Sequence, residues 1–358
     1  MSADPASGWP ASDEAMAAAA RFLREAGPRL VVVCDRDVDG ITGAELIARA
    51  LGPRGHTVER WAPPRGAHAH SPATRAHLDR RAPDAVVVVD QGSRAGAIAP
   101  GRPTLVIDHH QPSSAPDGAV FLSAYGHEPI APSSLLTYAL LQRALPDDAE
   151  ALAALGWLAL LGTVADLGLP RASALPGVAP LVERWPKRDV SEAVALLNAA
   201  RRAPVEATAA AQAVLAAARA PGDIARALVP GVETLREARR AVNAEVERCA
   251  RVAPRFYGSV AVLRFSSPAQ IHALIATRWV SRLPKYVILA ANDGYLAGRV
   301  SFSMRAFDRA RDLVALIRGL GVDPGGGELG HGHAQATGGN LPPDAFEQLL
   351  TAFAAIAA

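Results

Sequence analysis

Residues 30–43 decide the fold, and they read Leu30-Val31-Val32-Val33-Cys34-Asp35-Arg36-Asp37-Val38-Asp39-Gly40-Ile41-Thr42-Gly43. The first five residues are apolar and mostly β-branched, which is typical of a strand buried on both faces. Three aspartates then alternate through a turn, and apolar residues at helical spacing follow as far as Leu51, where Gly52-Pro53 ends the pattern. A buried strand, an acidic turn and a helix therefore follow one another directly.

Two further apolar runs end in the same way. The run over 85–89 ends at Asp90, and the run over 104–107 ends at Asp108. Another strand is predicted over 57–61, and helices are predicted over 15–25, 71–81, 133–145 and 149–164. This alternation predicts an α/β domain with a doubly wound, mostly parallel sheet. Because ligands in such domains bind outside the carboxyl ends of the strands, we expect the strand-end aspartates to form one site.

The candidate site residues are rich in carboxylates. They are Asp35, Asp37, Asp39, Asp90, Asp108 and Asp166, with the imidazoles of His109 and His110. Closely spaced carboxylates repel one another unless a cation neutralises them. Oxygen ligands mixed with one or two histidines suit Mn²⁺ or Mg²⁺, and two such ions are a common device for hydrolysing phosphate esters. One aspartate after a strand is often only a turn residue, but three at one sheet edge favour a metal site.

Composition excludes few classes of protein. The 358 residues carry a formal net charge of only +2, so there is no global basic field for nucleic acid. All but two of the 37 basic residues are arginines, which suit phosphate contacts, although biased codon usage explains this richness more simply. The two cysteines, Cys34 and Cys249, indicate no disulfide framework.

Neither a leader nor a membrane span is expected. Residues 1–15 contain three acidic residues and lack a basic leader before an apolar stretch. The most apolar run, over 149–164, falls short of the roughly 20 residues that a span needs. We therefore expect a cytoplasmic protein that does not contact a membrane.

The remaining sequence predicts a second, smaller α/β domain. A loop is expected over 169–186, an Ala-rich helical region over 190–219 and a long polar helix over 232–251, which would join the two domains. Strands are then predicted over 259–263, 286–290 and 296–303, with helices over 269–283 and 306–320. The expected organisation is a first domain over 1–190, a helical linker region over 191–254 and a second domain over 255–358; the family resemblance described next implies that the first is catalytic and the second binds substrate.

Several of these segments resemble the DHH phosphoesterase family, and its RecJ-like branch in particular. The segments that carry the resemblance are the Asp-x-Asp-x-Asp-Gly run with Ile41-Thr42 behind it, Asp108-His109-His110, Gly162-Thr163-Val164-Ala165-Asp166, the helix around 235–240, and 275–278, 298–301 and 332–338 in the second domain. Two positions depart from the family pattern: His331 stands where glycine is usual, and Arg36 where an aromatic or smaller polar residue is frequent.

The resemblance implies a role for each candidate residue. Two Mn²⁺ or Mg²⁺ ions would be held by Asp37, Asp39, Asp90, His109 and Asp166, with Asp90 bridging both ions and Asp35 as a further or supporting ligand. His110 would face the phosphate and help the leaving group, and Asp108 would orient the histidines. In the second domain, a substrate-binding wall would contain Arg299, Ser301, Arg305, Gly332 and His333.

The resemblance leaves more than one function open. The first is a RecJ-like exonuclease that hydrolyses phosphodiester bonds of single-stranded nucleic acid. The second is a phosphodiesterase for short oligonucleotides or cyclic dinucleotides, which is favoured because neither an OB domain nor an aromatic stacking platform is evident and only 5% of residues are aromatic. The third is a non-catalytic DHH binding module. A single-strand-binding partner would compensate for a missing OB domain, and the sequence does not fix the oligomeric state.

Overall fold

The structure is a computed structural model that describes residues 8–308, 310–333 and 335–355; the side chains of residues 331–333 also lie outside the description. The expectation about a leader therefore falls partly outside the described residues. The chain forms two compact units. The first comprises residues 1–201 and 207–235, and the second comprises residues 202–206 and 236–358. The boundary between residues 235 and 236 falls inside α11 (Val232–Cys249).

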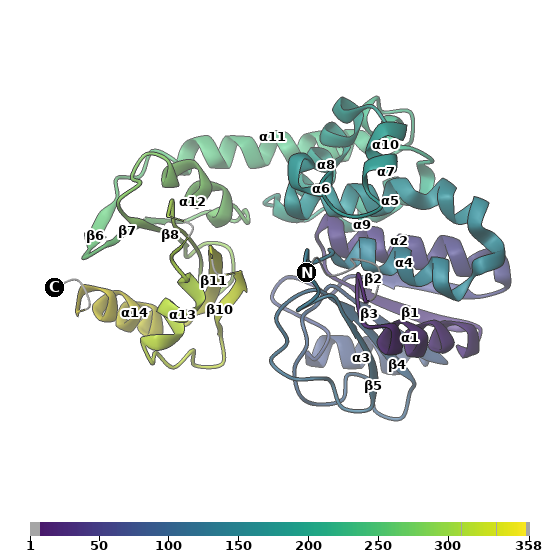
Figure 1. Cartoon of the computed structure of the whole chain (residues 1–358). Helices are drawn as coiled ribbons and strands as arrows, with labels where there is room; N and C mark the ends of the chain where they lie inside the picture. The colour runs from purple at the N-terminus through teal and green to yellow at the C-terminus, as the bar shows by residue number, and fades with distance from the viewer. Residues whose placement is uncertain (1–7, 309, 334, 356–358) are drawn as a thin grey trace, which may run out of the picture. The chain divides into compact units, whose positions relative to one another are not determined.

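The first unit is built on a five-stranded sheet in the order β2-β1-β3-β4-β5. Every neighbouring pair is parallel, which confirms the predicted doubly wound α/β fold (Figure 1). The strands are β1 (Arg29–Cys34), β2 (Thr57–Trp61), β3 (Ala85–Val89), β4 (Thr104–Asp108) and β5 (Ala119–Ser123). The sequence did not predict β5, an edge strand whose residues are mostly only half-buried.

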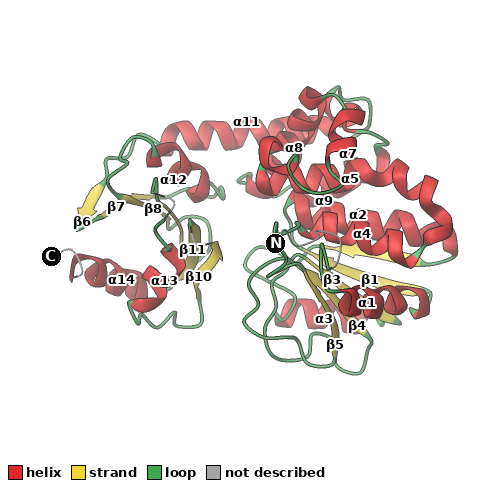
Figure 2. Ribbon diagram, viewed as in Figure 1, coloured by secondary structure: helices red, strands yellow, loops and turns green. Residues whose placement is uncertain are grey.

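Helices cover both faces of this sheet, as Figure 2 shows. One face carries Val32, Val87 and Ile107 and packs against the larger helical layer, and the other carries Val31 and Val88 and packs against α3. The elements of these layers are α1 (Asp13–Glu25), α2 (Val38–Leu51), α3 (Pro72–Arg81), α4 (Ser133–Ala144) and α5 (Ala149–Leu167), with the short helices η1 (Gly52–Arg54) and η2 (Pro146–Asp148). Because the central strands are buried on both faces, their sequences read as continuous apolar runs.

Helix α5 is longer than its sequence pattern suggested. Residues Pro146–Leu167 are long and apolar enough to cross a membrane by length and composition alone, so the argument that this run is too short was wrong. The segment from Gly156 to Val164 is buried in the core of the first unit. Packing inside the unit therefore explains the apolar composition of the helix.

The region after α5 contains two helices where a loop was expected. They are α6 (Leu169–Ala172) and α7 (Ala179–Arg184). Each has a proline in its first turn, where the missing N–H costs no hydrogen bond, so these prolines begin helices rather than exclude them.

Three more helices complete the first unit. They are α8 (Lys187–Arg202), α9 (Thr208–Ala217) and α10 (Pro221–Ala225). Apolar residues of all three, including Leu196, Leu215 and Ile224, belong to the core of the first unit. The domain limits that we predicted at residues 190 and 254 stay predictions, but these contacts group most of α8 to α10 with the first unit.

The second unit contains a six-stranded mixed sheet in the order β10-β11-β9-β8-β7-β6. The β7–β8 pair is parallel, and the other pairs are antiparallel. The strands are β6 (Arg255–Tyr257), β7 (Val260–Phe265), β8 (Val287–Asn292), β9 (Val300–Arg305), β10 (Glu328–His333) and β11 (Ala336–Leu341). The helices are α12 (His272–Val280), α13 (Leu313–Gly319) and α14 (Pro343–Ala355).

The glycine-rich stretch near the end of the chain forms a β-hairpin. Gly338 and Gly339 lie in β11, where an added Cβ would collide with the carbonyl oxygens of Phe302 and Glu328 respectively. These glycines therefore permit close packing of neighbouring strands.

Helix α13 begins at Leu313, later than the predicted start at residue 306. Asp312 caps the helix by accepting a hydrogen bond from the Ala315 N–H, 2.9 Å away.

Gly162→Ala tests the packing of α5 beneath the acidic turn. An added Cβ would overlap Ser134 Oγ of α4 and Thr42 Oγ1 of α2, which are both buried. We expect the free energy of unfolding to fall by about 1–3 kcal/mol, measured by urea denaturation.

Gly52→Ala is the matched control for this change. Gly52 has helical dihedral angles (φ −53°, ψ −50°) and no atom within 4 Å of an added Cβ. Its replacement should leave stability unchanged or raise it by up to about 1 kcal/mol. Equal unfolding midpoints for the two variants would contradict this description of the α2–α4–α5 contact.

Candidate metal centre

The strand-end aspartates meet at the point where the order of the sheet reverses. Asp35 follows β1, Asp90 follows β3, and Asp108 is the last residue of β4. Strands β1 and β3 are neighbours, while the chain continues from β1 to β2 on the other side. This topological switch point is where open α/β sheets bind ligands.

The acidic turn is held by its own backbone. Asp35 Oδ1 accepts a hydrogen bond from the Asp37 N–H at 2.9 Å, and Asp37 Oδ1 accepts one from the Gly40 N–H at 3.0 Å. Asp37 is thus the N-cap of α2. A Cβ at Gly40 would lie 2.6 Å from the Asp35 carbonyl oxygen, so only glycine fits this closely folded turn.

The N-terminus of α4 neutralises part of the charge on Asp39. The N–H groups of Ser133 and Ser134 donate to the two oxygens of Asp39 at 2.7 and 3.0 Å, and the Ser134 hydroxyl also donates to Asp39. The Ser133 hydroxyl donates to Asp90 Oδ1 at 2.9 Å. A helix N-terminus favours negative charge, so α4 stabilises two carboxylates that would otherwise repel each other.

Asp90 and the two histidines form a compact group of possible metal ligands. His109 Nε2 lies 3.3 Å from Asp90 Oδ1, and His110 Nδ1 lies 2.9 Å from Asp108 Oδ1. Each member of the trio Asp90, His109 and His110 offers one ligand atom, and these atoms lie within 4.8 Å of one another. Mixed carboxylate and imidazole donors at this spacing fit a divalent ion such as Mn²⁺.

Asp90 has an unusual backbone conformation. Its φ of 63° lies in the left-handed region, which few residues other than glycine adopt. The backbone N–H of Asp90 donates to the Ile107 carbonyl at 3.0 Å, which fixes the residue beside β4. This conformation directs the chain out of β3 at the switch point, and such strain is typical of functional positions.

The local charges shift the pKa values of the aspartates. Burial, followed by neighbouring carboxylates, raises the pKa of Asp90 well above its ordinary value. Burial likewise raises the pKa of Asp39 to about 6, with His109 opposing the shift and Asp166 and Asp37 adding to it. For Asp37 burial acts in the same direction, but Arg201 and the Gly40 N–H outweigh it and lower the pKa.

Asp108 controls the charge of the neighbouring His110 ring. Burial disfavours the charged His110 ring, yet the hydrogen bond and charge of Asp108 raise the pKa of His110 to about 9. His110 is therefore protonated at neutral pH.

Two neighbours of the acidic turn were not predicted from the sequence. Arg201, near the end of α8, places its guanidinium nitrogens 3.7 Å from Asp37 Oδ2 and 4.0 Å from Asp35 Oδ1. The Gln91 side chain donates to Asp35 Oδ2 at 3.3 Å. Nothing in an arginine-rich sequence distinguishes Arg201, whereas Gln91 could have been suspected because it follows Asp90.

Asp166 lies at the end of α5 and is exposed. Its charge raises the pKa of Asp39, which indicates that the two are near each other, but the described trio of possible ligands does not include it. Its role as a metal ligand stays a prediction.

The predicted substrate-binding residues belong to the second unit. Ser301 and Arg305 lie in β9, and Arg299 immediately precedes it. Arg299 donates to the Gly326 carbonyl at 3.3 Å, while its Nη1 atom and the Ser301 hydroxyl are buried without a hydrogen-bond partner among the described residues. Arg305 donates to the Met304 carbonyl at 2.8 Å, and burial lowers its pKa. Gly332 and His333 lie in β10, and their side chains fall outside the described residues.

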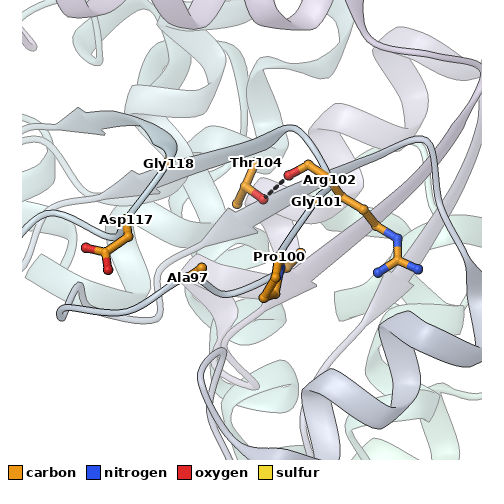
Figure 3. A pocket seen from close by; sticks show the side chains of 8 residues that line it. Ala97, Pro100, Gly101, Arg102, Thr104, Asp117 and Gly118 are labelled. Atoms are coloured by element: carbon orange, nitrogen blue, oxygen red, sulfur yellow. Dashed lines mark hydrogen bonds between the residues drawn. The ribbon is translucent and has the colours of Figure 1, made fainter.

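A separate cavity of about 360 Å³ lies at the other end of the first sheet. Figure 3 shows its lining, which includes Thr104 at the start of β4 and Asp117 and Gly118 just before β5. The carboxylates lie at the opposite ends of the strands. This cavity therefore has no part in the candidate metal centre.

These features define a class of α/β protein with an aspartate–histidine cluster at the switch point of a parallel sheet. Residues 29–163 match the family model described as DHH family, N-terminal domain. This match confirms the DHH resemblance seen in the sequence for the first unit, over residues 29–163.

The chain is similar in fold to RecJ structures over nearly its whole length. RecJ from Thermus thermophilus in complex with Mn²⁺ matches with a TM-score of 0.69 and 21% identity, covering 96% of this chain and 55% of that one. The chain thus spans about half the length of that protein. An exonuclease RecJ bound to manganese matches with a TM-score of 0.63 and 20% identity, covering 96% and 94% of the two chains.

A further solved structure shares the fold. A DHH domain described as a member of the s1p family of ribosomal proteins matches with a TM-score of 0.63 and 16% identity, covering 96% of this chain and 89% of that one. The comparison with curated proteins gave no match. At these identities the structural likenesses establish the fold.

Mn²⁺ binding should weaken steeply at acid pH. The pKa of Asp39 in the folded protein, about 6, lies above its ordinary value of about 3.9. Protonation therefore stabilises the metal-free fold at low pH, and this contribution is lost as the pH rises through 6. Because Mn²⁺ competes with that proton, its affinity should fall roughly tenfold per pH unit below pH 6.

Calorimetric titration at several pH values measures this dependence. The rise in Tm on adding Mn²⁺ should also be larger at pH 7.5 than at pH 5.5. An Mn²⁺ affinity that is independent of pH between 5 and 7.5 would contradict the raised pKa of Asp39.

Arg201→Gln should strengthen Mn²⁺ binding. The guanidinium lies close to two carboxylates, so its positive charge opposes a cation at the same place. Removing a charge interaction of about 1 kcal/mol should raise the affinity roughly fivefold, measured by calorimetry. Arg188→Gln is the control, because Arg188 is an exposed residue of the same helix. Weaker or unchanged Mn²⁺ binding by Arg201→Gln would show that Arg201 does not compete with the cation.

Proposed function

We propose that the chain is a metal-dependent phosphodiesterase that hydrolyses single-stranded nucleic acid as a RecJ-like exonuclease. The observation that carries the proposal is the cluster of Asp90, His109 and His110 at the switch point of the sheet. Asp39 and Asp37 surround it, held by α4 and by the first turn of α2. The DHH family comprises metal-dependent phosphoesterases, which supports an enzyme of this class.

The proposed ligands are the predicted set. Asp37, Asp39, Asp90, His109 and Asp166 would hold two Mn²⁺ or Mg²⁺ ions, with Asp35 as a further ligand or support. RecJ proteins of this fold have been solved with both metals. Bound metal would supply the charge that activates a water molecule and stabilises the phosphate in the transition state.

The protein's own groups would orient and protonate the substrate. His110 is half-buried and carries a proton at neutral pH, because Asp108 raises its pKa to about 9. It can therefore donate that proton to the leaving oxygen of a phosphodiester. Asp108 is fully buried and bonded to His110 Nδ1, so it fixes the ring and directs Nε2 outward.

The second unit carries groups suited to a phosphate. Arg299 Nη1 and the Ser301 hydroxyl are buried polar atoms with no hydrogen-bond partner in the described parts of the chain. Such atoms are costly unless a ligand satisfies them, and both are donors that match phosphate oxygens. They support the expectation that this unit binds the substrate.

We also propose a cytoplasmic location for the protein, as the sequence suggested.

Dependence on substrate length distinguishes an exonuclease from a dinucleotide enzyme. The Mn²⁺-loaded protein is incubated with single strands of two, five and about twenty nucleotides, as DNA and as RNA, beside a cyclic dinucleotide. A kcat/KM that rises with length supports the exonuclease. A preference for two to five nucleotides or for the cyclic substrate would replace it with a small-nucleotide phosphodiesterase. The absence of hydrolysis with any substrate would favour a non-catalytic binding module.

Asp90→Asn should abolish hydrolysis while the fold persists. Asp90 contacts His109 and Ser133 and would bridge both metal ions, so its loss removes several kcal/mol of transition-state stabilisation. We expect kcat to fall by more than about a thousandfold. Asp117→Asn is the control, because Asp117 is exposed in the separate cavity. Activity above a few per cent in Asp90→Asn would refute the two-metal proposal.

A further inference from the structure

One segment of the second unit is free of acidic residues. Residues 248–292 contain seven arginines and lysines and no aspartate or glutamate. Three of the seven, Arg248, Arg264 and Arg278, pair with acids outside the segment. The other four are exposed and have no ion-pair partner among the described residues; they are Arg251, Arg255, Arg282 and Lys285.

Two aromatic rings lie in the same part of the unit. Strand β6 is an edge strand, and its Tyr257 packs on the core between the sheet and α14. Because successive side chains of a strand alternate, Phe256 points to the opposite face, on the side of α12. There the Phe256 ring lies 4.8 Å from the ring of Tyr286, and Phe256 remains 52% exposed.

Three of these cations lie at the end of α12 and in the turn that leads to Tyr286. Tyr286 lies in the turn after α12, where its N–H donates to the Leu283 carbonyl at 3.0 Å. Lys285 immediately precedes Tyr286 in the chain, and Arg282 begins the same turn. The Arg282 guanidinium lies 5.2 Å from the centre of the Trp279 ring. Trp279 Nε1 in turn donates to the carbonyl of Ala250 at 3.3 Å, which brings Arg251 to the same end of α12.

The charges around Glu247 support this arrangement. The hydrogen bond and the charge of Arg278 lower the pKa of Glu247, and Arg251 and Arg282 add to the effect. The three guanidiniums thus lie around one carboxylate. That carboxylate is bonded to Arg278 at 2.6 Å, so Arg251 and Arg282 keep an unneutralised charge.

We propose that Arg251, Phe256, Arg282, Lys285 and Tyr286, here called the edge surface, bind single-stranded nucleic acid. The exposed Phe256 ring, with the partly buried Tyr286 ring beside it, offers a face on which unpaired bases can stack, and the cations contact the neighbouring phosphates. Stacking requires exposed base faces, so a single strand fits this surface better than a duplex does. Charge complementarity also favours a polyanion over a second copy of the chain, which would bring the same cations together.

The edge surface is distinct from the predicted substrate-binding residues. It lies at the β6 edge of the sheet, whereas Gly332 and His333 lie in β10 at the other edge (Figure 1). The inference rests on the proposed function for its substrate class and adds a second place where a long strand is held. Its test requires no catalysis.

Binding is measured by fluorescence anisotropy with the full chain, a 5′-labelled twenty-nucleotide thymidine strand and a chelator that prevents hydrolysis. Phe256→Ala should raise Kd at least about fivefold. On a strand of the same length without bases, the same change should have no effect. Arg282→Gln and Lys285→Gln should each lower the slope of log affinity against log salt by about 0.7.

Arg255→Gln is the matched control. Arg255 adjoins Phe256 and is exposed, but it points to the opposite face of β6 and should leave both affinity and salt slope unchanged. Phe256→Leu keeps an apolar side chain but has no aromatic face, so it separates a loss of stacking from a loss of fold. Thermal melts of every variant check that each one is folded. Phe256→Leu should weaken binding nearly as much as Phe256→Ala.

Three outcomes would overturn the inference. They are wild-type affinity in Phe256→Ala, an equal effect of Arg255→Gln and Arg282→Gln, and equal affinity for duplex and single strand. A Phe256-dependent dimer in sedimentation, without an effect on strand binding, would assign the surface to a second copy instead. Hydrolysis of a trinucleotide is measured in parallel. If the wild type binds as expected but hydrolyses nothing, the proposed function fails and the edge surface stands.

Discussion

Repulsion between buried carboxylates is the constraint on which the rest of this structure depends. Asp39 and Asp90 are almost fully buried, and Asp35 and Asp37 lie beside them in one turn. Like charges at this spacing destabilise a fold unless protons, helix dipoles or cations offset them. Each neighbouring element supplies such an offset: α4 directs two N–H groups at Asp39, α8 brings Arg201, and two histidines follow β4.

The same constraint links the packing of the first unit to its chemistry. Gly162 allows α5 to lie against Ser134, and Ser134 bonds to Asp39, so helix packing and carboxylate position are set together. The buried carboxyl groups of Asp39 and Asp90, whose pKa values are raised by burial, mark where a divalent cation would bind. In the second unit, by contrast, Arg251, Arg282 and Lys285 have no ion-pair partner among the described residues, and the edge surface that we propose for them lies across the sheet from β10.

Much of the fold could be predicted because its strongest signals are local. The central strands are buried on both faces, so they appear as apolar runs of five or six residues, and all four strands predicted in the first unit are present. Residues 119–122 of β5 do form an apolar run, so that strand could have been predicted, whereas β6 has only three residues and gives too short a signal. Helices α6 and α7 were missed because each begins with a proline, and a short proline-containing helix has the same composition as a loop.

The sequence by itself determined which carboxylates follow strands, and parallel pairing then requires those strand ends to meet. It also carried the family resemblance, because the motif residues are adjacent in the chain. Only the tertiary structure decided which groups compensate the charge. Arg201 lies about 165 residues after Asp37 in the chain, and Ser133 lies about 95 residues after Asp39. Contacts between such distant residues depend on helix packing in three dimensions, to which no local pattern of residues corresponds.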